Sequence, residues 1–455
     1  MLGAKIAVAR AAGALSRRSG RGATSLPGKL LMRMEPGAIE RLASRLPQGS
    51  AVISATNGKT TTAAMVAAIL ERSGTRLVHN RAGANMAGGV ASVLLAAARG
   101  EAIDGDAGLF EVDEFWLDRV VPQLRPRALL LANLFRDQLD RYGELETIAD
   151  RWAAAVAAAP GTQLVLNADD PLVADLGRAG PAGAVTYFGV QDDVVALQGM
   201  AHASDSKHCR RCGAPYVYDA IYMGHLGRYH CPNGDSQRPQ PDVYASAVRL
   251  DGTRGARFTL HLGGERAEVA LPLPGLYNVY NALGAAALAS ALGAPLAQIV
   301  EGLEATQAAF GRAETVTVGG RELAILLVKN PAGANEVLRT LALDEGEHDL
   351  LAVLNDNTAD GRDVSWIWDA DFEVIAPRVR LVTCSGTRAA ELALRLKYAG
   401  VPPERLRVVA GLERALDAAL EDGAGRLVAL PTYTAMLALR ELLVTRGAAH
   451  RSFAR

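Results

Sequence analysis

The stretch "ISATNGKTTTAAMVAAILERSG", residues 53–74, decides the fold that we expect. An apolar run leads into Asn57-Gly58-Lys59-Thr60, and a helical pattern follows and ends at Gly74. The first N–H groups and the dipole of a helix attract anions, and Gly58 lets the backbone come close to phosphates. Lys59 can reach the β and γ phosphates, and the Thr60 hydroxyl can bind Mg²⁺. The pattern predicts a phosphate-binding loop, although Ile53 stands where the usual first glycine would be.

Composition excludes several classes of protein. The 455 residues suggest two or three domains, and hydrophobic residues (49%) and charged residues (21%) occur in ordinary proportions. A formal net charge of -1 gives no electrostatic footprint for nucleic acid. No apolar run reaches membrane-spanning length, so we expect no transmembrane segment. The four cysteines and the absence of an export signal favour a reducing compartment.

Short apolar runs alternate with helical patterns along most of the chain. This alternation predicts an α/β protein whose first large domain is a doubly wound, mainly parallel sheet. A stretch rich in Cys, His, Gly and Tyr interrupts the pattern, which restarts after about residue 315 as a second, Rossmann-like α/β domain. The expected parts are a basic N-terminal segment (1–50), a domain with the phosphate loop (51–315) and an insertion (200–241), and a C-terminal domain (316–455) that is expected to bind a partner.

A nucleotide-bound Mg²⁺ needs oxygen ligands at the carboxyl ends of neighbouring strands. The run "LFEVDE" ends an expected strand with three acids. Glu111 is the predicted metal ligand. Asp113 and Glu114 are interpreted as a solvated acidic start of the next helix.

Six motifs occur in a fixed order: "TNGKTTT", "EVDE", "NLFRDQLDRYGE", "LNADDP", "GLYNVYNALGAAALA" and "FGRAE". Over residues 50–315 this order resembles the central ATPase domain of the Mur ligase family. The resemblance implies ligation through an acyl phosphate made from ATP. It also implies that Asn281 contacts the adenine and Arg312 the ribose and phosphates. Ala55 and Gln138 depart from the family pattern, and Gln138 puts a second Mg²⁺ in doubt.

Most Mur ligases carry a domain for a UDP-linked substrate before the ATPase, and about fifty residues are too few for one. We therefore do not expect a UDP-anchored substrate. The N-terminal "GRGATSLPGKLLMRMEP", the cysteine insertion and "LVKNPAGANEVL" with "NDNTADGRDVSWIWDADFE" are similar to the MurT branch of the family. This resemblance implies amidation of the D-Glu α-carboxyl of the lipid II stem peptide, with ammonia from a GatD-type glutamine amidotransferase partner. It also implies a cytoplasmic protein at the inner face of the plasma membrane.

The cysteine insertion has the spacing of a zinc ribbon. Cys209 and Cys212 form a C-x₂-C pair, and 18 residues separate Cys212 from Cys231. These three thiols are the predicted Zn²⁺ ligands. Gly234 stands where MurT relatives have a fourth cysteine. Asp235, His230, His225, His208 or water are the alternatives for the fourth ligand, and a ribbon held only by tyrosine packing remains another.

The loop "NTADGRDVSWIWD" carries a further hypothesis from the resemblance. Asp360, with Asp363 as second choice, would orient the histidine of a Cys–His pair in the partner's active site, as the third member of a triad does. The alternative is a loop whose aspartates cap neighbouring backbone groups. Trp366 and Trp368 are candidate interface anchors. Cys384 is expected to be a buried thiol without catalytic function.

Three hypotheses therefore remain. The first is the ATP-dependent amidating subunit of a two-protein complex, with Lys59 and Asp360 as the catalytic residues. The second is a stand-alone ligase similar to folylpolyglutamate synthase, and the third is a nucleotide-binding scaffold without activity. The N-terminal helix is basic and amphipathic, and its contact with a membrane is a separate hypothesis.

Overall fold

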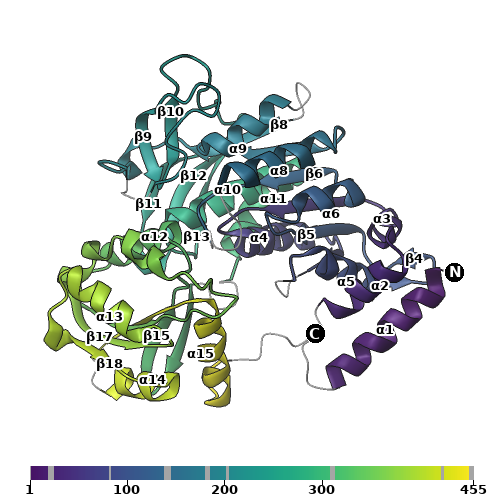
Figure 1. Cartoon of the computed structure of the whole chain (residues 1–455). Coiled ribbons are helices and arrows are strands. Elements are labelled where there is room, and N and C mark those ends of the chain that lie inside the picture. The colour runs from purple at the N-terminus through teal and green to yellow at the C-terminus, as the bar shows by residue number, and fades with distance from the viewer. Residues whose placement is uncertain are drawn as a thin grey trace.

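The computed structural model describes residues 2–18, 25–80, 84–137, 145–179, 185–200, 204–307, 313–421 and 425–449. Two sheets, each covered by helices, make up most of the molecule (Figure 1). The N-terminal helices lie at one end of the larger sheet, and the cysteine insertion lies toward the other end. Gln138 and Arg312 fall outside the described residues.

The larger sheet has nine strands within the described part of the chain. From β2 to β11 neighbouring strands are parallel, and β11, β12 and β13 form an antiparallel meander at the other edge. Strands such as β1 are buried on both faces, and the central residues of β1, Ala51, Val52 and Ile53, are accordingly apolar. In order across the sheet the strands are β13 (Glu265–Leu271), β12 (Ala256–Leu262), β11 (Val243–Leu250), β8 (Val185–Val190), β7 (Gln163–Asn167), β6 (Ala128–Leu131), β1 (Ser50–Ser54), β5 (Ala107–Glu111) and β2 (Leu77–His79).

Helices cover both faces of this sheet. On one face lie α4 (Lys59–Arg72), α10 (Leu276–Ala291) and α11 (Leu296–Glu304). Because α10 is Ala-rich and apolar on nearly all sides, it is buried along most of its length. The helices of the other face are α5 (Ala87–Ala97), α6 (Leu117–Leu124) and α8 (Leu145–Ala157), and the short α9 (Pro171–Asp175) follows β7.

The N-terminal segment folds onto the second of these faces. It forms α1 (Leu2–Arg18), α2 (Leu26–Met34) and α3 (Ala38–Ala43), and its apolar residues join the core around α5 and α6. The Lys5 ammonium pairs with Glu35 at 3.0 Å, and the Arg10 guanidinium donates to the Leu95 carbonyl at 2.7 Å. Two of the basic side chains of α1 therefore bind the protein itself. Among the described residues, no helix combines the length and the apolar character that a membrane crossing needs.

The cysteine insertion lies between β8 and β11, which are neighbours in the large sheet. It contains a separate hairpin of β9 (Val217–Met223) and β10 (Leu226–His230). Another small ribbon, β3 (Ala98–Arg99) with β4 (Ala102–Ile103), follows α5.

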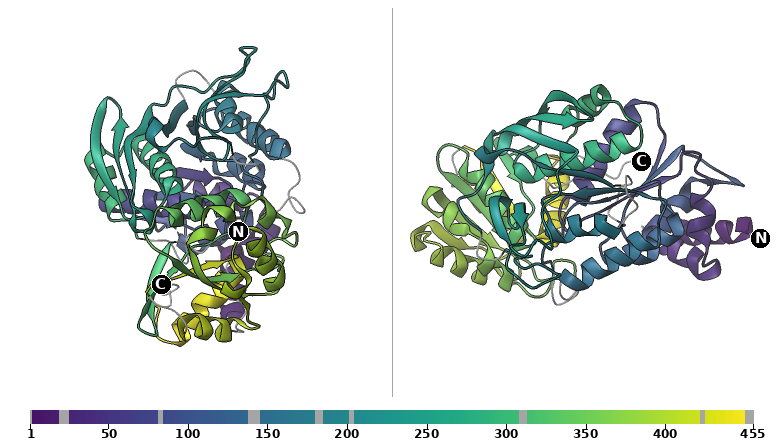
Figure 2. Two further views of the ribbon diagram at one scale, coloured as in Figure 1. Left: turned by 90° about the vertical axis from the view of Figure 1, so that its left-hand side faces the viewer. Right: turned by 90° about the horizontal axis from the view of Figure 1, so that it is seen from above.

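The second sheet lies on the C-terminal side of the chain, and Figure 2 shows it from two further directions. One face packs on α12 (Pro331–Ala342) and α13 (Ala389–Tyr398), and the other packs on α14 (Leu412–Glu421) and α15 (Tyr433–Thr445). Among the strands of this sheet that the structure describes, only β14 runs antiparallel to its neighbour. Its strands, in order, are β14 (Glu314–Val318), β15 (Arg321–Ile325), β19 (Leu427–Pro431), β16 (His348–Val353), β17 (Val379–Ser385) and β18 (Leu406–Val408).

These two sheets confirm the predicted α/β class, with a large mainly parallel sheet and a second α/β sheet. They also confirm the strand that precedes the phosphate loop and the helix that follows it. The extents assigned to the domains in the sequence analysis stay predictions.

Close backbone contact between α2 and α5 holds the N-terminal helices in place. The Gly28 N–H donates to Ser92 Oγ at 2.9 Å, and a Cβ at Gly28 would lie 2.0 Å from the Gly88 carbonyl oxygen. We predict that Gly28→Ala forces α2 away from α5 and lowers the free energy of unfolding by about 1–3 kcal/mol. Urea titration of the full chain measures this.

The matched control is Gly161→Ala, where an added Cβ meets nothing within 4 Å. We expect that control to stay within about 0.5 kcal/mol of the parent protein. Equal stability of the two variants would contradict the close packing of α2 on α5.

Candidate active site

The loop between β1 and α4 is shaped by its neighbours. Gly58 has φ +89°, and a Cβ at this position would lie 2.0 Å from Asn281 Oδ1. Only glycine combines this left-handed backbone with that close approach. The Asn57 N–H donates to Asn133 Oδ1 at 2.9 Å, and Asn133 Nδ2 donates back to the Asn57 carbonyl at 3.0 Å. The loop is thus held open as a cradle at the N-terminus of α4, which fits an anion.

Lys59 is the first residue of α4, and its ammonium lies inside the cradle. Its Nζ is 2.6 Å from Glu114 Oε2 and also donates to the Ala55 carbonyl. Burial disfavours the charged lysine, but the carboxylates of Glu114 and Asp113 outweigh that effect and raise the pKa of Lys59. The ammonium therefore stays charged across the physiological pH range.

Thr60 and Glu111 lie together beside the loop. The Thr60 hydroxyl donates to Glu111 Oε2 at 2.9 Å, and Glu111 is almost fully buried at the end of β5. Asn80, just after β2, fixes the backbone of Glu111 through two hydrogen bonds of 2.8 and 2.9 Å. His79 Nε2 lies 3.9 Å from Glu111 Oε1. A hydroxyl and a carboxylate at this spacing form a donor set that suits Mg²⁺.

The interpretation of Asp113 and Glu114 as solvated helix-start acids is wrong. Both side chains are buried, with 8% and 3% of their surfaces exposed. The chain turns after β5 so that Glu114 points to Lys59, while Asp113 accepts from the Phe115 N–H at 3.1 Å. Burial and the charge of Glu114 raise the pKa of Asp113. A local acidic pattern could not reveal this turn, because the lysine that pairs with it lies 55 residues away.

Asn281 lies on α10 directly above the loop. Thr62 Oγ1 donates to its Oδ1 at 3.3 Å, and its Nδ2 donates to Asn278 Oδ1 at 3.0 Å. Asn281, Asn278 and Tyr277 all line the cleft that contains the phosphate loop. The structure thus brings Asn57, Gly58, Lys59, Thr60, Glu111 and Asn281 to one place. Arg312 lies outside the described residues.

The cleft has a second wall, which comes from the C-terminal sheet. Lys329 and Gly333 contribute to it from the start of α12, and Tyr433 contributes from the start of α15. Asn57 and Asn330 join the walls by two reciprocal side-chain hydrogen bonds of 3.1 and 3.2 Å. Lys329 Nζ lies 2.5 Å from Asp137 Oδ2.

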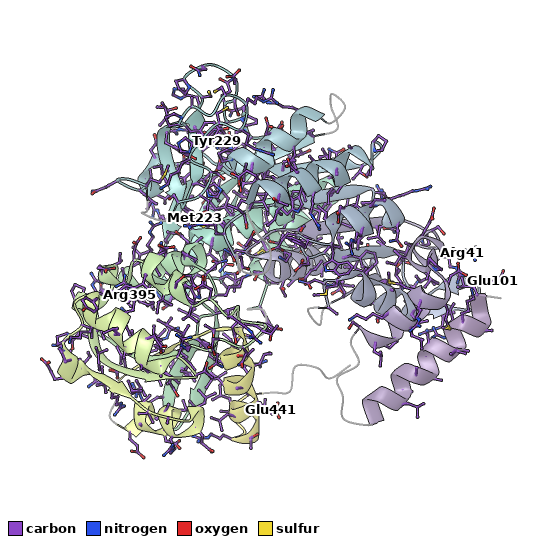
Figure 3. All side chains as sticks on the ribbon, in the orientation of Figure 1. Arg41, Glu101, Met223, Tyr229, Arg395 and Glu441 are labelled. Atoms are coloured by element: carbon purple, nitrogen blue, oxygen red, sulfur yellow. The ribbon has the colours of Figure 1, made fainter. Side chains whose placement is uncertain are left out.

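The turn of the β9–β10 hairpin in the cysteine insertion lies at the same cleft. Met223 and Phe135 line it, and Figure 3 shows Met223 where the hairpin meets the C-terminal half of the molecule. His225, fully buried, packs on the Phe135 ring with 4.8 Å between ring centroids, and it lies 3.4 Å from Asp170 Oδ2.

Asp360 faces inward. Its carboxylate accepts from the Thr434 N–H at 2.7 Å and from the Thr434 hydroxyl at 2.5 Å, at the start of α15. Asp363 is exposed and accepts from the Ser365 N–H at 2.8 Å. Hydrogen bonds from the Ser365 side chain and then from its N–H lower the pKa of the Asp363 carboxyl. The contact of Asp363 matches the backbone-capping alternative, whereas Asp360 caps a helix 74 residues farther along the chain. A role of either residue in a partner's active site stays a prediction, and Asp363 is the more accessible of the two.

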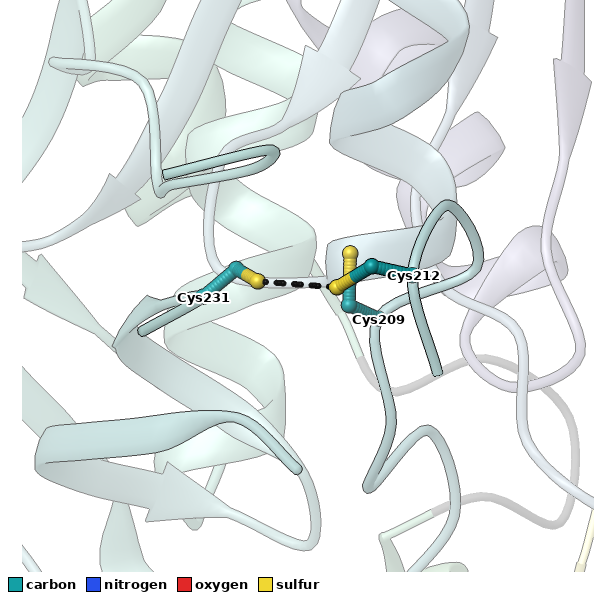
Figure 4. A group of neighbouring side chains, drawn as sticks. All are labelled: Cys209, Cys212 and Cys231. Atoms are coloured by element: carbon teal, nitrogen blue, oxygen red, sulfur yellow. Dashed lines mark hydrogen bonds between the residues drawn. The ribbon is translucent and has the colours of Figure 1, made fainter. Parts of the chain in front are cut away.

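Three cysteines of the insertion converge, as their spacing predicted. The sulfurs of Cys209, Cys212 and Cys231 all lie within 4.8 Å of one another (Figure 4). Two tight turns hold the cysteines. In the turn with Cys209 and Cys212, the Gly213 N–H donates to the Cys209 carbonyl at 2.8 Å, and in the turn after Cys231 the Gly234 N–H donates to the Cys231 carbonyl at 2.9 Å. Three thiols held by two such turns fit a zinc ion.

The structure separates the candidates for a fourth ligand. His225 lies beside Asp170 and packs on the Phe135 ring. His230 Nδ1 lies 3.7 Å from Asp219 Oδ2. Asp235 is the acid whose side chain hydrogen-bonds to the Cys212 thiol. In the described part of the chain, no histidine or carboxylate joins the sulfurs within the same 4.8 Å.

Cys384 is buried on β17, and burial raises the pKa of its thiol to about 12. This confirms the expectation of a buried thiol. Trp366 packs on the core of the second sheet, whereas Trp368 is half exposed and lies near Tyr398, with 5.9 Å between ring centroids.

Sequence reasoning gave no role to Asn133, Asp137 or Lys329, and it misplaced Glu114. All four lie in segments that the sequence analysis recognised as motifs. Asn133 and Asp137 lie within "NLFRDQLDRYGE", Lys329 within "LVKNPAGANEVL" and Glu114 within "EVDE".

Two family models match the chain. Residues 53–233 match the Mur ligase middle domain, and residues 327–436 match the MurT ligase C-terminal domain. The chain is 34% identical to the lipid II isoglutaminyl synthase (glutamine-hydrolyzing) subunit MurT of Streptococcus pneumoniae, over 94% of each chain. It is also 34% identical to the subunit of the same name from Staphylococcus aureus (strain N315), over 96% of this chain and 97% of that relative.

Solved structures of Mur-type ligases share the fold. A pseudomurein peptide ligase type C from Methanothermus fervidus superposes with a TM-score of 0.66 at 23% identity. The match covers 89% of this chain and 80% of that one. At this identity the likeness concerns the fold alone.

The cysteine cluster leads to a prediction about metal content. We expect the purified protein to carry one zinc ion per chain, and we expect Cys209→Ser or Cys231→Ser to lose it and to lower the melting temperature, because a structural zinc site contributes to folding. Metal analysis and thermal melting measure both effects.

Cys384→Ser is the control for zinc content, because its thiol lies in the second sheet, far from the cluster in sequence and fold. After chelation, three thiols should react with a thiol reagent while Cys384 stays protected until the chain unfolds. Full zinc content in the Cys231→Ser variant would show that the cluster is not the metal site.

Proposed function

Since this chain belongs to the MurT branch of the Mur ligase family, we propose that it uses ATP to activate a carboxylate for amidation. The chain is a Mur-type ligase subunit, and its relatives are named for lipid II isoglutaminyl synthesis. The observation that supports the proposal most directly is the Lys59 ammonium, held charged in a glycine cradle between two sheets.

We propose that the loop formed by Asn57, Gly58, Lys59 and Thr60 holds the phosphates of ATP. The open backbone at Gly58 and the N-terminus of α4 favour anionic oxygens. Thr60 and Glu111 would hold Mg²⁺, which when bound neutralises charge on the β and γ phosphates. Asn281, beside Gly58, would contact the nucleotide base, and Arg312 would contact the ribose and phosphates.

The proposed reaction has two steps. In the first, a carboxylate oxygen of the acceptor attacks the γ-phosphorus. A new O–P bond forms, the bond to the bridging oxygen breaks, and ADP leaves. In the second, ammonia attacks the acyl carbon, a C–N bond forms, phosphate leaves with the C–O electron pair, and the nitrogen loses a proton. Lys59 stabilises the charge that develops on the transferred group.

The proposed acceptor is the D-Glu α-carboxyl of the lipid II stem peptide, and the proposed nitrogen source is ammonia from a GatD-type glutamine amidotransferase. The relatives' names include both lipid II and glutamine hydrolysis, and they describe a subunit. Cys384, the thiol of the second sheet, is buried, and so glutamine hydrolysis is assigned to the partner. We place the reaction on the cytoplasmic side of the membrane, where ATP is available and cysteines stay reduced.

We further propose that Cys209, Cys212 and Cys231 bind a structural Zn²⁺ and that Asp235 or water completes the set. The hairpin whose tip lines the cleft begins next to this cluster. The ion would therefore order one wall of the active site without taking part in the reaction.

One assay tests the proposed function. We predict that the chain, given ATP, Mg²⁺, lipid II and ammonium chloride, releases phosphate and forms amidated lipid II. Lys59→Met should lower the rate by a factor of about 100 or more, because a charge that stabilises the transition state is lost. Mass spectrometry of the product and phosphate release measure the two outcomes.

Three outcomes would contradict the proposal or a part of it. Turnover only with a folate and glutamate would favour a ligase like folylpolyglutamate synthase, and nucleotide binding without turnover, even with the partner, would favour a scaffold. Equal rates for Lys59→Met and the parent would remove the role of the phosphate loop.

The exposed loop after β16 leads to a separate prediction about the partner. If Asp363 orients the partner's histidine, Asp363→Asn should lower glutamine-dependent amidation and leave ammonium-dependent amidation unchanged. Asp360→Asn should instead lower both, because it removes the charge and one of the two oxygens that accept from Thr434 at the start of α15. Loss confined to the glutamine-dependent rate in Asp360→Asn, with none in Asp363→Asn, would reverse this assignment.

A further inference from the structure

Lys329 crosses the cleft from the C-terminal half of the molecule. It lies between β15 and the start of α12, yet its ammonium reaches the large sheet. Its Nζ is 2.5 Å from Asp137 Oδ2 and donates to the Thr56 carbonyl at 3.2 Å. Thr56 is part of the phosphate loop itself. A cation from the second sheet therefore lies against the loop at which the proposed phosphate transfer occurs.

The backbone around Lys329 is held in place, so this approach is not an accident of a long side chain. Asn330, the next residue, caps α12 by accepting from the Gly333 N–H at 2.9 Å. The same side chain makes both hydrogen bonds with Asn57 across the cleft. Asn330 is nearly fully buried, whereas about a quarter of the Lys329 side chain is exposed to the cleft. The anchor is rigid, and the ammonium keeps access to a ligand.

The charges around the loop form one cluster. Lys59 pairs with Glu114, and Lys329 pairs with Asp137. Asp113 lies within electrostatic reach of both lysines. Burial of Asp137 opposes its ionised form even with Lys329 beside it and raises the pKa of that carboxyl. The Lys329 ammonium can thus exchange its contact with Asp137 for a contact with an anionic ligand.

We propose that Lys329 binds the terminal phosphate of ATP and follows that phosphoryl group as it moves to the acceptor carboxylate. This inference rests on the proposed function and adds a residue to it. As the O–P bond forms and the bond to ADP breaks, negative charge lies on the transferred oxygens. Lys59 meets these oxygens from the large sheet, and Lys329 meets them from the second sheet. The chemistry of the ligand is that of a γ-phosphate or an acyl phosphate.

A simpler role for Lys329 is that of a latch which holds the two walls together. The two roles predict different effects on the binding of ATP and ADP. A latch affects every nucleotide equally, because it acts on the closed cleft. A phosphate contact affects a triphosphate and leaves a diphosphate unaffected, because ADP lacks the oxygens in question.

Calorimetric binding of ADP and of a non-hydrolysable ATP analogue, both with Mg²⁺, separates the two roles. Lys329→Met should weaken binding of the analogue roughly 10- to 100-fold, which is the range for loss of a hydrogen bond to a charged group, and should leave ADP binding unchanged. Lys329→Arg keeps the charge and should retain most of the preference for the analogue. Lys397→Met, an exposed lysine on α13, is the matched control and should bind both nucleotides as the parent does.

Equal loss of both nucleotides, or no loss of either, would overturn the proposal. A second readout uses Mg²⁺. Lys329→Met leaves Asp137 without its cation, and a carboxylate is a good ligand for a divalent ion. A higher Mg²⁺ concentration should then restore part of the analogue binding in Lys329→Met and should change binding by the parent little. The absence of any restoration would favour the latch role. Neither measurement needs amidation, so a failure of the proposed reaction would show separately.

Discussion

The buried ion pair between Lys59 and Glu114 is the contact on which the rest of the site depends. A lysine ammonium this deep in a protein is costly unless a carboxylate meets it at close range. That need explains why the chain turns sharply after β5 and carries Glu114 back to the N-terminus of α4. It also explains why the site carries more acids than bases: the carboxylates hold the lysine charged until phosphate oxygens arrive.

Around this pair the architecture is one of two sheets that aim at the same cleft. The carboxyl ends of β1, β5 and β6 bring the phosphate loop, Glu111 and Asn133 to one edge of the large sheet. The ends of β15 and β19 bring Lys329 and Tyr433 to face them. Parallel sheets bind ligands at this edge, and two such edges set opposite each other enclose a site to which both contribute. The Asn57–Asn330 pair fixes their spacing.

The cysteine insertion is part of this arrangement and not a separate appendage. Its three thiols lie near one end of the β9–β10 hairpin, and Met223 at the other end lines the cleft. His225, packed on Phe135 and paired with Asp170, fixes the hairpin to the large sheet. The β9–β10 hairpin therefore connects the cysteine turns directly to the wall of the cleft.

The sequence by itself determined what depends on local pattern: the strand–loop–helix around Gly58, the alternation that makes two α/β sheets, the spacing of the cysteines and the order of the motifs. It could assign Thr60 and Glu111 to one site because parallel strands end at one edge. Only the tertiary structure decided the pairs that join distant segments, such as Lys59 with Glu114 and Lys329 with Asp137. It also turned Asp360 inward, toward α15. The reason is that burial assigns partners to charges, and burial depends on how whole elements pack.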